Sequence, residues 1–357
     1  MKNTLKDATD LRVYHLGLRP GEVANRIVTV GSPSRARIIA KFLDETPKPF
    51  TLESERGFLT ITGRYKGTPI TVLSIGMGAP NMDFFVREVR ECLSGDMLVV
   101  RLGSCGCLIN APVGTVVVPK ACVAVTRNVD FDFLNPEASQ EPPYRISKLV
   151  YGDTELHAQL KQSLEAAKPN NSETQILADI VNASADSFYS SQGRQTAFPD
   201  HNEHVIEDLL KVPDVVTLEM ETHHLYHLAA CWGRRIGAQQ ALTAPLTTSP
   251  VLPTSTPSHA TATLEPTAPL ASPDAKIRVS AAQMIFAARS SRDFITPEQV
   301  NELEHWTGKV GTGSYPMSMT TQLDAFFVIQ GVLEALCQMT IPLDKQHPEQ
   351  GSVWETL

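Results

Sequence analysis

Residues 26–35 read RIVTVGSPSR, a short β-branched run that ends in a glycine turn and leads into a helical pattern. The same order recurs where Pro69–Ser74 runs into Gly76–Pro80, and Met97–Leu102 is likewise followed by a glycine turn at Gly103–Gly106. Strands that end in glycine turns and lead into helices indicate a mostly parallel sheet with helices on both faces. The sequence therefore predicts an α/β fold.

The composition excludes several classes of protein. The chain has 357 residues, a formal net charge of -8, 42% hydrophobic residues and 20% charged residues, which is typical of a globular protein. The acidic balance argues against a nucleic-acid partner or an anionic membrane, although it leaves room for a local basic pocket. The first residues carry no apolar signal core, and no apolar run reaches the ~18 residues of a membrane span. The six cysteines are scattered through apolar stretches, which favours a reducing compartment, and we expect a cytoplasmic protein.

Two stretches do not fit the alternation of strands and helices. Between Gln239 and Pro273 the chain turns to Ala, Thr, Pro and Ser with almost no charge, a composition that cannot bury enough apolar surface to become ordered. Val310–Gln330 contains GTGSYP and interrupts a helical pattern that resumes at Val332–Gln338. Both stretches are either surface insertions or translated non-coding sequence. We expect one domain over residues 1–357, with a flexible insertion at 239–273 and an irregular insertion near 310–330.

The glycine turns carry the features of an anion site. Gly31–Arg35 presents backbone N–H groups at a helix start with an arginine beside them, which suits a phosphate or a sulfate. Arg101 interrupts an apolar run, where an arginine needs an anion or a carboxylate as partner. Each turn alone is explained by helix capping or by a tight turn. Because ligands of open α/β sheets gather at the carboxyl ends of strands, the turns together predict one anion site.

Two later segments offer contacts for a planar base and a sugar. Phe188 provides a stacking surface, and Gln192 and Arg194 provide an amide and a guanidinium for the polar edge of a heterocycle. Glu219 and Glu221 flank a methionine at the expected start of a helix, where a carboxylate can accept hydrogen bonds from vicinal sugar hydroxyls.

The same helix raises the alternative of a metal site. Glu219, His223 and His227 are spaced i, i+4 and i+8, a stripe that could ligate zinc. No fourth ligand stands at a recognisable spacing, and such a stripe is more often packed or solvated, so we predict no metal. The turn that holds Cys105 contains no histidine base, so we do not expect a catalytic cysteine.

The ordered set of motifs resembles the nucleoside phosphorylase family, and within it the members that act on uridine. The F-Y-x-x-Q-x-R stretch that begins at Phe188 and the E-M-E stretch that begins at Glu219 are the specific parts of the match. The resemblance implies a single α/β domain with a central mixed, partly barrel-like sheet flanked by helices. The segments that carry it are Tyr14–Leu18, Gly31–Arg35, Ser54–Phe58, Gly76–Pro80, Arg101–Gly106, Ser184–Arg194 and Glu219–Glu221.

The resemblance also implies a role for each matching residue. Arg101, Glu221 and Arg194 would be catalytic, and Arg289 would belong to a closing flap. His15 and Arg56 would act across a subunit interface, so we expect at least a homodimer. Inorganic phosphate would be a co-substrate, with no cofactor, no metal and no monovalent cation. The phosphate would be held by Gly31, Arg35, Arg56, Arg101 and Ser104, the ribose by His15, Met220 and Glu221, and the base by Phe188, Gln192 and Arg194.

The activity expected from the resemblance is reversible phosphorolysis of uridine to uracil and ribose 1-phosphate in pyrimidine salvage. Deoxyuridine and thymidine are further candidate substrates. Three alternatives stay open: a purine nucleoside phosphorylase, a nucleosidase on the same scaffold, and a nucleoside-binding protein that has lost turnover. The Gln192 and Arg194 pair argues against purines, which usually meet an acidic hydrogen-bond acceptor in this fold. The three arginines expected to hold phosphate, Arg35, Arg56 and Arg101, argue against a plain hydrolase, which would not need phosphate.

Overall fold

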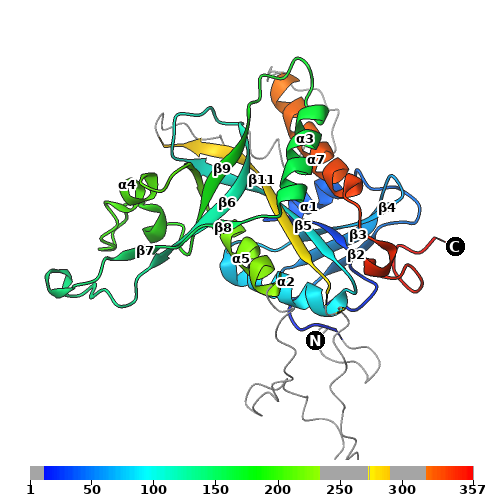
Figure 1. The fold of residues 1–357 in the computed structure, drawn as a ribbon, viewed down its shortest axis with the longest axis horizontal. Coiled ribbons are helices and arrows are strands. Elements are labelled where there is room, and N and C mark those ends of the chain that lie inside the picture. The colour runs from blue at the N-terminus through cyan, green and yellow to red at the C-terminus, as the bar shows by residue number, and fades with distance from the viewer. Residues whose placement is uncertain (1–11, 234–271, 273, 290–318, 357) are drawn as a thin grey trace, which may run out of the picture.

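A computed structural model describes residues 12–233, 272, 274–289 and 319–356 of the chain (Figure 1). The strands are β1 (Arg26–Val30), β2 (Phe50–Glu53), β3 (Leu59–Tyr65), β4 (Thr68–Ser74), β5 (Met97–Cys107), β6 (Val116–Arg127), β7 (Tyr144–Ile146), β8 (Val150–Tyr151), β9 (Ile176–Ala185), β10 (Val215–Glu219) and β11 (Ile277–Ala288). The helices are α1 (Pro33–Ala40), α2 (Ala79–Cys92), α3 (Thr154–Ala167), α4 (Val205–Leu210), α5 (Thr222–Gly233) and α7 (Met319–Gln338).

The described strands form one mixed sheet, in the order β10-β9-β6-β11-β5-β1-β4-β3-β2. The pairs of β5 with β1 and β11, of β6 with β9 and of β9 with β10 are parallel, whereas β2, β3 and β4 pair antiparallel. An additional antiparallel pairing of β10 with β5 closes β10, β9, β6, β11 and β5 into a ring. The expected α/β class with a mixed sheet is therefore confirmed.

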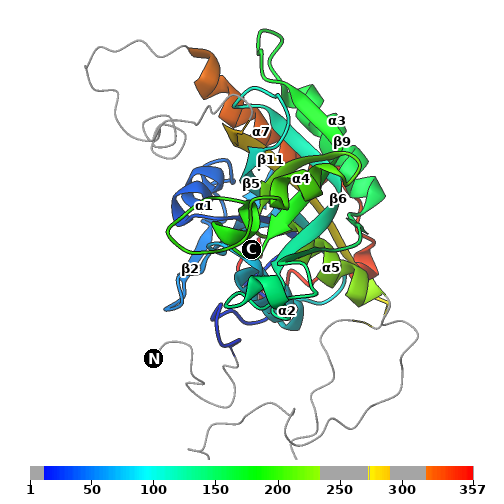
Figure 2. The same cartoon turned by 90° about the vertical axis from the view of Figure 1, so that its left-hand side faces the viewer.

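Helices cover both faces of the sheet, as the two perpendicular views show (Figures 1 and 2). Along β5, Met97 and Val99 pack with α2 and α5, while Leu98 and Val100 pack with α1, α3 and α7. This alternation of buried residues is what a strand with two covered faces requires. The apolar run at Met97–Leu102 therefore packs against helices on both faces of the sheet.

Three local predictions were wrong. Gly103–Gly106 was expected as a turn, but it continues β5, because these residues pair with β11 on one side and with β10 on the other. The helix expected from Glu219 begins at Thr222, and Glu219 ends the strand β10. The irregular stretch expected at 310–330 is helical from Met319 onward. The rest of that stretch and the insertion expected at 239–273, Ser272 apart, lie outside the described residues.

A glycine sets the distance between α3 and α7. A Cβ at Gly331 would lie 2.9 Å from the Cα of Leu164, closer than side-chain atoms approach a backbone. We expect Gly331→Ala to lower the free energy of unfolding by about 1–3 kcal/mol, because the crowding outweighs the gain of about 1 kcal/mol in helix propensity. Urea unfolding of Gly331→Ala should be compared with that of Gly233→Ala. A Cβ at Gly233 would lie more than 4 Å from every other atom counted among the described residues. Equal stability of the two variants would contradict this packing.

Candidate active site

One cavity of about 320 Å³ gathers residues from most of the predicted binding segments. Its volume is within the range of small-molecule pockets. The predicted residues that line it are Gly31, Arg35, Arg101, Ser104, Phe188, Gln192, Arg194, Met220 and Glu221. The cavity is formed where β1, β9, β10 and β11 end, next to the second half of β5.

The anion end of the cavity combines a helix start with a buried arginine. Ser32 caps α1 by accepting a hydrogen bond from the backbone N–H of Arg35 at 3.3 Å. Arg101 is only 4% exposed, and its Nη2 donates to Oε2 of Glu221 at 3.0 Å. Its Nε and Nη1 are buried and have no hydrogen-bond partner among the described residues. A buried guanidinium with two unused donors is suited to bind an anion.

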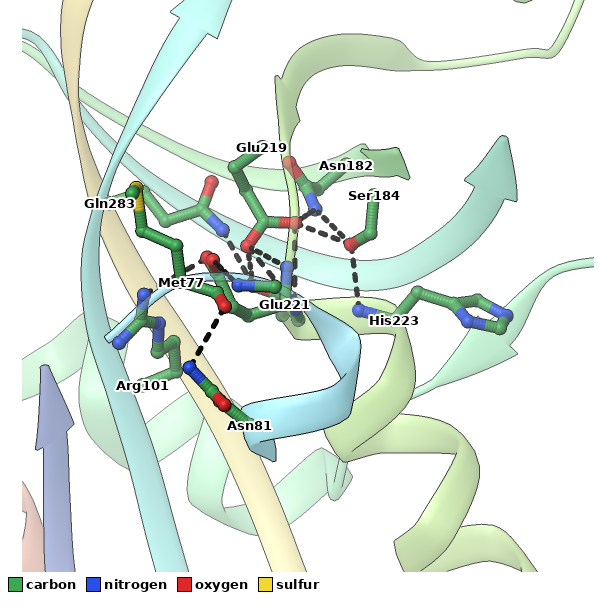
Figure 3. A network of polar contacts seen from close by, with 11 residues as sticks. Met77, Asn81, Arg101, Asn182, Ser184, Glu219, Glu221, His223 and Gln283 are labelled. Carbon is green, nitrogen blue, oxygen red and sulfur yellow. Dashed lines mark hydrogen bonds and ion pairs between the residues drawn. The ribbon is translucent and has the colours of Figure 1, made fainter. Parts of the chain in front are cut away.

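Glu221 lies between this arginine and the glycine turn that follows β4 (Figure 3). Its Oε1 accepts a hydrogen bond from the backbone N–H of Gly78 at 2.6 Å. Gly78 has a φ of +89°, a conformation that side-chain-bearing residues rarely adopt. The turn thus holds the carboxylate that would contact the sugar.

Glu219 lines the same cavity, but its carboxylate is surrounded by hydrogen-bond donors (Figure 3). Its carboxylate accepts from Nδ2 of Asn182, from the hydroxyls of Ser184 and Thr222, and from the backbone N–H groups of Glu221 and Thr222. Both hydroxyls already accept other hydrogen bonds, Ser184 from the N–H of His223 and Thr222 from Gln283, so their own protons face Glu219. Burial and the nearby Glu221 raise the pKa of Glu219. The network fixes the start of α5 and with it the position of Glu221.

The base end carries two guanidinium groups and an aromatic ring. Arg194 lies 4.0 Å above the ring centroid of Phe188, and Arg289 donates to the backbone carbonyl of Gln192. Burial lowers the pKa of both arginines, and the charge of Arg194 lowers that of Arg289 further. Two like charges at one edge favour a ligand group that accepts hydrogen bonds or becomes negative.

A short turn shapes this end. Gly193 adopts a φ of +62°, and a Cβ there would lie 3.1 Å from Cγ1 of Ile206. Nδ2 of Asn202 donates to the carbonyls of Ser190 and Arg194 at 2.9 and 3.0 Å. The backbone between β9 and α4 is thereby fixed, so that Phe188, Gln192 and Arg194 reach the cavity together.

Three predicted residues do not line the cavity: Arg289, which contacts the backbone of Gln192 as described above, and His15 and Arg56, which lie elsewhere. Nδ1 of His15 is 2.5 Å from Oε1 of Glu88, and its ring stacks on Phe84 with 3.8 Å between centroids. Nη2 of Arg56 donates to the hydroxyl of Tyr14 at 3.1 Å. Neither residue lines the cavity of its own chain.

The sequence reasoning missed Met77 and Phe286 as lining residues. Phe286 lies in β11 and packs its ring 5.3 Å from the guanidinium carbon of Arg35. The sequence feature that could have indicated Phe286 is an aromatic residue near the end of β11, four positions after Ala282, which belongs to the apolar core. Cys105 also lines the cavity, and burial raises the pKa of its thiol well above the ordinary value. A thiol of that kind is a poor nucleophile, in agreement with the role denied to it from sequence.

The histidine stripe on α5 is partly exposed, with His223 half-buried and His227 on the surface. The rings of His223 and His227 stack with centroids 5.9 Å apart, and the carboxylate of Glu219 is occupied by the donors described above. No group of three or more possible metal ligands gathers anywhere in the described part of the chain.

The stripe predicts a pH dependence of stability. Burial, followed by the charges of His227 and His224, lowers the pKa of His223 to about 4. As the pH falls from about 6.5 to 4, the unfolded chain takes up a proton that the folded chain refuses, so stability is lost in that window. We expect a loss of about 1–2 kcal/mol after solvent screening. Urea unfolding at pH 7.5 and pH 5 should show a smaller difference for His223→Gln, but an unchanged one for Gln162→Ala, which removes an exposed side chain that does not titrate.

The sheet and the pocket together define a class of enzyme. A buried arginine with unused donors, a carboxylate that can accept from sugar hydroxyls and a guanidinium that can meet a base lie together at strand ends, an arrangement that suits a pentosyltransferase with an anionic acceptor. The chain belongs to the phosphorylase superfamily, whose family model matches residues 25–250. It is accordingly an enzyme of the pentosyltransferase type, in a family whose members use nucleoside and phosphate as substrates.

Known relatives include enzymes for both kinds of nucleoside. The chain is 30% identical over 228 residues to a uridine phosphorylase of Thermococcus kodakarensis, which covers 63% of this chain and 74% of the relative. It is 28% identical over 242 residues to a DeoD-type purine nucleoside phosphorylase of Roseobacter denitrificans, which covers 67% and 90%. Among solved structures, a uridine phosphorylase of the oomycete Phytophthora capsici is 33% identical, with a TM-score of 0.70 over 96% of this chain and 99% of the other.

The described helices were also compared with the requirements of a membrane span. None of them combines the length and the apolar character that crossing a bilayer needs.

Proposed function

We propose that the chain is a uridine phosphorylase, which converts uridine and phosphate reversibly to uracil and ribose 1-phosphate. The observation that carries this proposal is the chemistry of the base end, where Gln192 and Arg194 bring an amide and a guanidinium group to the cavity and Arg289 is bonded to the backbone of Gln192. The O2 and O4 of uracil accept hydrogen bonds from such donors, and its N3–H can donate to the amide oxygen of Gln192. The similarity to uridine phosphorylases at 30% and 33% identity supports the same choice.

The reaction breaks the bond between C1′ of the ribose and N1 of the base while a phosphate oxygen bonds to C1′. Positive charge develops on the ribose and negative charge on the departing base. Glu221 would stabilise the first, together with the phosphate dianion held by Arg35 and Arg101. Gln192 and Arg194 would disperse the second. Catalysis of this kind rests on positioning and preorganised electrostatics, with no covalent intermediate on the protein.

His15 and Arg56 would complete the site of a neighbouring subunit, since they lie outside the cavity of their own chain. We propose a homo-oligomer of at least two chains on this basis. The six cysteines are free, and four of them are buried, which supports the expected reducing, cytoplasmic setting.

The proposal is tested by product formation from uridine, thymidine and inosine, each with and without phosphate. Uracil and ribose 1-phosphate formed only with phosphate are the expected result. A preference for inosine would overturn the assignment of the base site while keeping the phosphate site. Base release without phosphate would indicate a nucleosidase, and absence of turnover with all three substrates would contradict the proposal as a whole.

Arg194→Ala should raise KM for uridine by about 10- to 150-fold, because a hydrogen bond from a charged group is worth about 1.5–3 kcal/mol. The KM for phosphate should change less than about threefold. Steady-state kinetics with each substrate varied in turn measures both values. Arg37→Ala, which removes an exposed arginine paired with Glu53 outside the cavity, is the control and should change neither. Equal losses for both substrates would contradict the role of Arg194.

A further inference from the structure

One ion pair, between Arg101 and Glu221, connects the proposed phosphate site with the proposed ribose site. Arg101 comes from β5 and belongs to the anion end, whereas Glu221 lies between β10 and α5 at the sugar end. The two side chains are 4% and 5% exposed, and both line the cavity. Their contact of 3.0 Å is therefore buried and lies within the site itself.

Neither partner is fully satisfied by the other. Only Nη2 of Arg101 makes a hydrogen bond, while Nε and Nη1 have no partner in the described part of the chain. Glu221 receives one donor on each oxygen, from Gly78 and from Arg101. Glu219 differs sharply, because five donors already surround it. Of the two carboxylates, only Glu221 can exchange a partner for a ligand without leaving the network that holds α5.

We propose that the Arg101–Glu221 pair makes the binding of phosphate and of nucleoside mutually reinforcing. The inference rests on the proposed function, since it takes the anion to be phosphate and the sugar to be the ribose of the nucleoside. Phosphate takes the place of Glu221 at Nη2 of Arg101 and also accepts from Nε and Nη1, which the carboxylate leaves unused, and the ribose hydroxyls replace Arg101 as donors to Glu221. Each ligand thus substitutes for one half of the pair.

The sign of the coupling follows from this exchange. A ligand that binds alone separates the pair and leaves one buried charge without its partner, which is unfavourable. The ligand that binds second finds the pair already separated and supplies the missing partner. By linkage, phosphate raises the affinity for nucleoside by the same factor by which nucleoside raises the affinity for phosphate.

Calorimetric titration of the full chain measures this factor. The nucleoside probe is a uracil C-nucleoside, whose carbon–carbon glycosidic bond resists phosphorolysis. We expect the Kd of phosphate to fall at least about tenfold when the probe is saturating, and the Kd of the probe to fall equally with saturating phosphate. The 2′,3′-dideoxy form of the same probe offers Glu221 no hydroxyl, so with it the factor should stay below about twofold.

Two variants test whether the Arg101–Glu221 pair is the source of the coupling. Glu221→Gln removes the charge from the pair and should bring the factor close to one, whatever the separate affinities become. Asp83→Asn removes a carboxylate that pairs with Arg87 and His224 outside the cavity, and it should keep the full factor. The comparison of the two probes needs no variant, and so it decides the matter even where Glu221→Gln does not fold.

The outcomes separate the inference from the function. Phosphate and probe that each bind, with the same affinity alone and together, would overturn the inference and leave the proposed function standing. Coupling that persists with the dideoxy probe or in Glu221→Gln would also overturn it, because the pair would not be its source. Failure of both phosphate and probe to bind would overturn the proposed function and the inference with it.

Discussion

Replacing Arg101 with methionine should lower kcat/KM for uridine phosphorolysis by about a thousandfold. Loss of a single preorganised donor to a developing charge costs about a hundred- to a thousandfold in comparable sites, and Arg101 would supply more than one donor to phosphate. The variant also leaves Glu221 buried without its ion-pair partner, so the free energy of unfolding should fall as well. Steady-state kinetics at saturating phosphate measures the loss.

The control for Arg101→Met is a second buried arginine in a neighbouring strand. Arg26 in β1 donates to the carbonyls of Leu336 and Met339 near the end of α7, and it does not line the cavity. Arg26→Met should lower stability and leave kcat/KM within about threefold of the unsubstituted enzyme. An Arg101→Met enzyme that retains a tenth of the original kcat/KM would contradict the role of Arg101 in phosphate binding.

Glu219→Ala should lower the free energy of unfolding by about 3–5 kcal/mol. The substitution leaves the amide of Asn182 and the hydroxyls of Ser184 and Thr222 without an acceptor, and each unsatisfied buried group costs about 1–3 kcal/mol. Relaxation of these groups toward one another makes the total smaller than the sum. Because the network also fixes the start of α5, kcat should fall along with stability.

Urea unfolding and kinetics on the same preparations test this expectation. Glu219→Gln is the more specific test of the hydrogen bonds, because it keeps the shape of the side chain but turns an amide N–H₂ toward groups that donate. It should also be destabilised, whereas a site that needed only the volume of the side chain would tolerate it. Glu165→Ala, on the exposed surface of α3, should stay within about 0.5 kcal/mol. A loss below about 1 kcal/mol for Glu219→Ala would contradict the network.

The sequence predicted the elements whose residues repeat with a clear period. The β-branched run of Arg26–Val30 is a strand with the expected bounds, because its residues pack alternately into the two buried layers. The carboxyl end of β5 was not predictable in the same way. Gly103 and Gly106 favour a turn by composition, and only pairing with β11 and β10, which lie far away in sequence, makes them extended.

The site shows the same division between local and distant information. Residue types indicated the anion, sugar and base contacts, and most of those residues do line one cavity. The partners within the site were hidden, since no local pattern connects Glu221 with Gly78, 143 positions earlier, or with Arg101, 120 positions earlier. Which of the two carboxylates faces the ligand was likewise decided by Asn182, a residue of another strand.

The turn that presents Phe188, Gln192 and Arg194 lies between β9 and α4, outside the closed ring of five strands, and its shape is held by Gly193 and Asn202. In the proposed site, recognition of the nucleobase would thereby be separable from the chemistry at C1′. Substitutions in this one turn would alter the base contacts without disturbing the strands that hold Arg101 and Glu221. A lineage built on this ring would therefore change its nucleobase by local replacement, and the relatives of this chain are named for both pyrimidine and purine nucleosides.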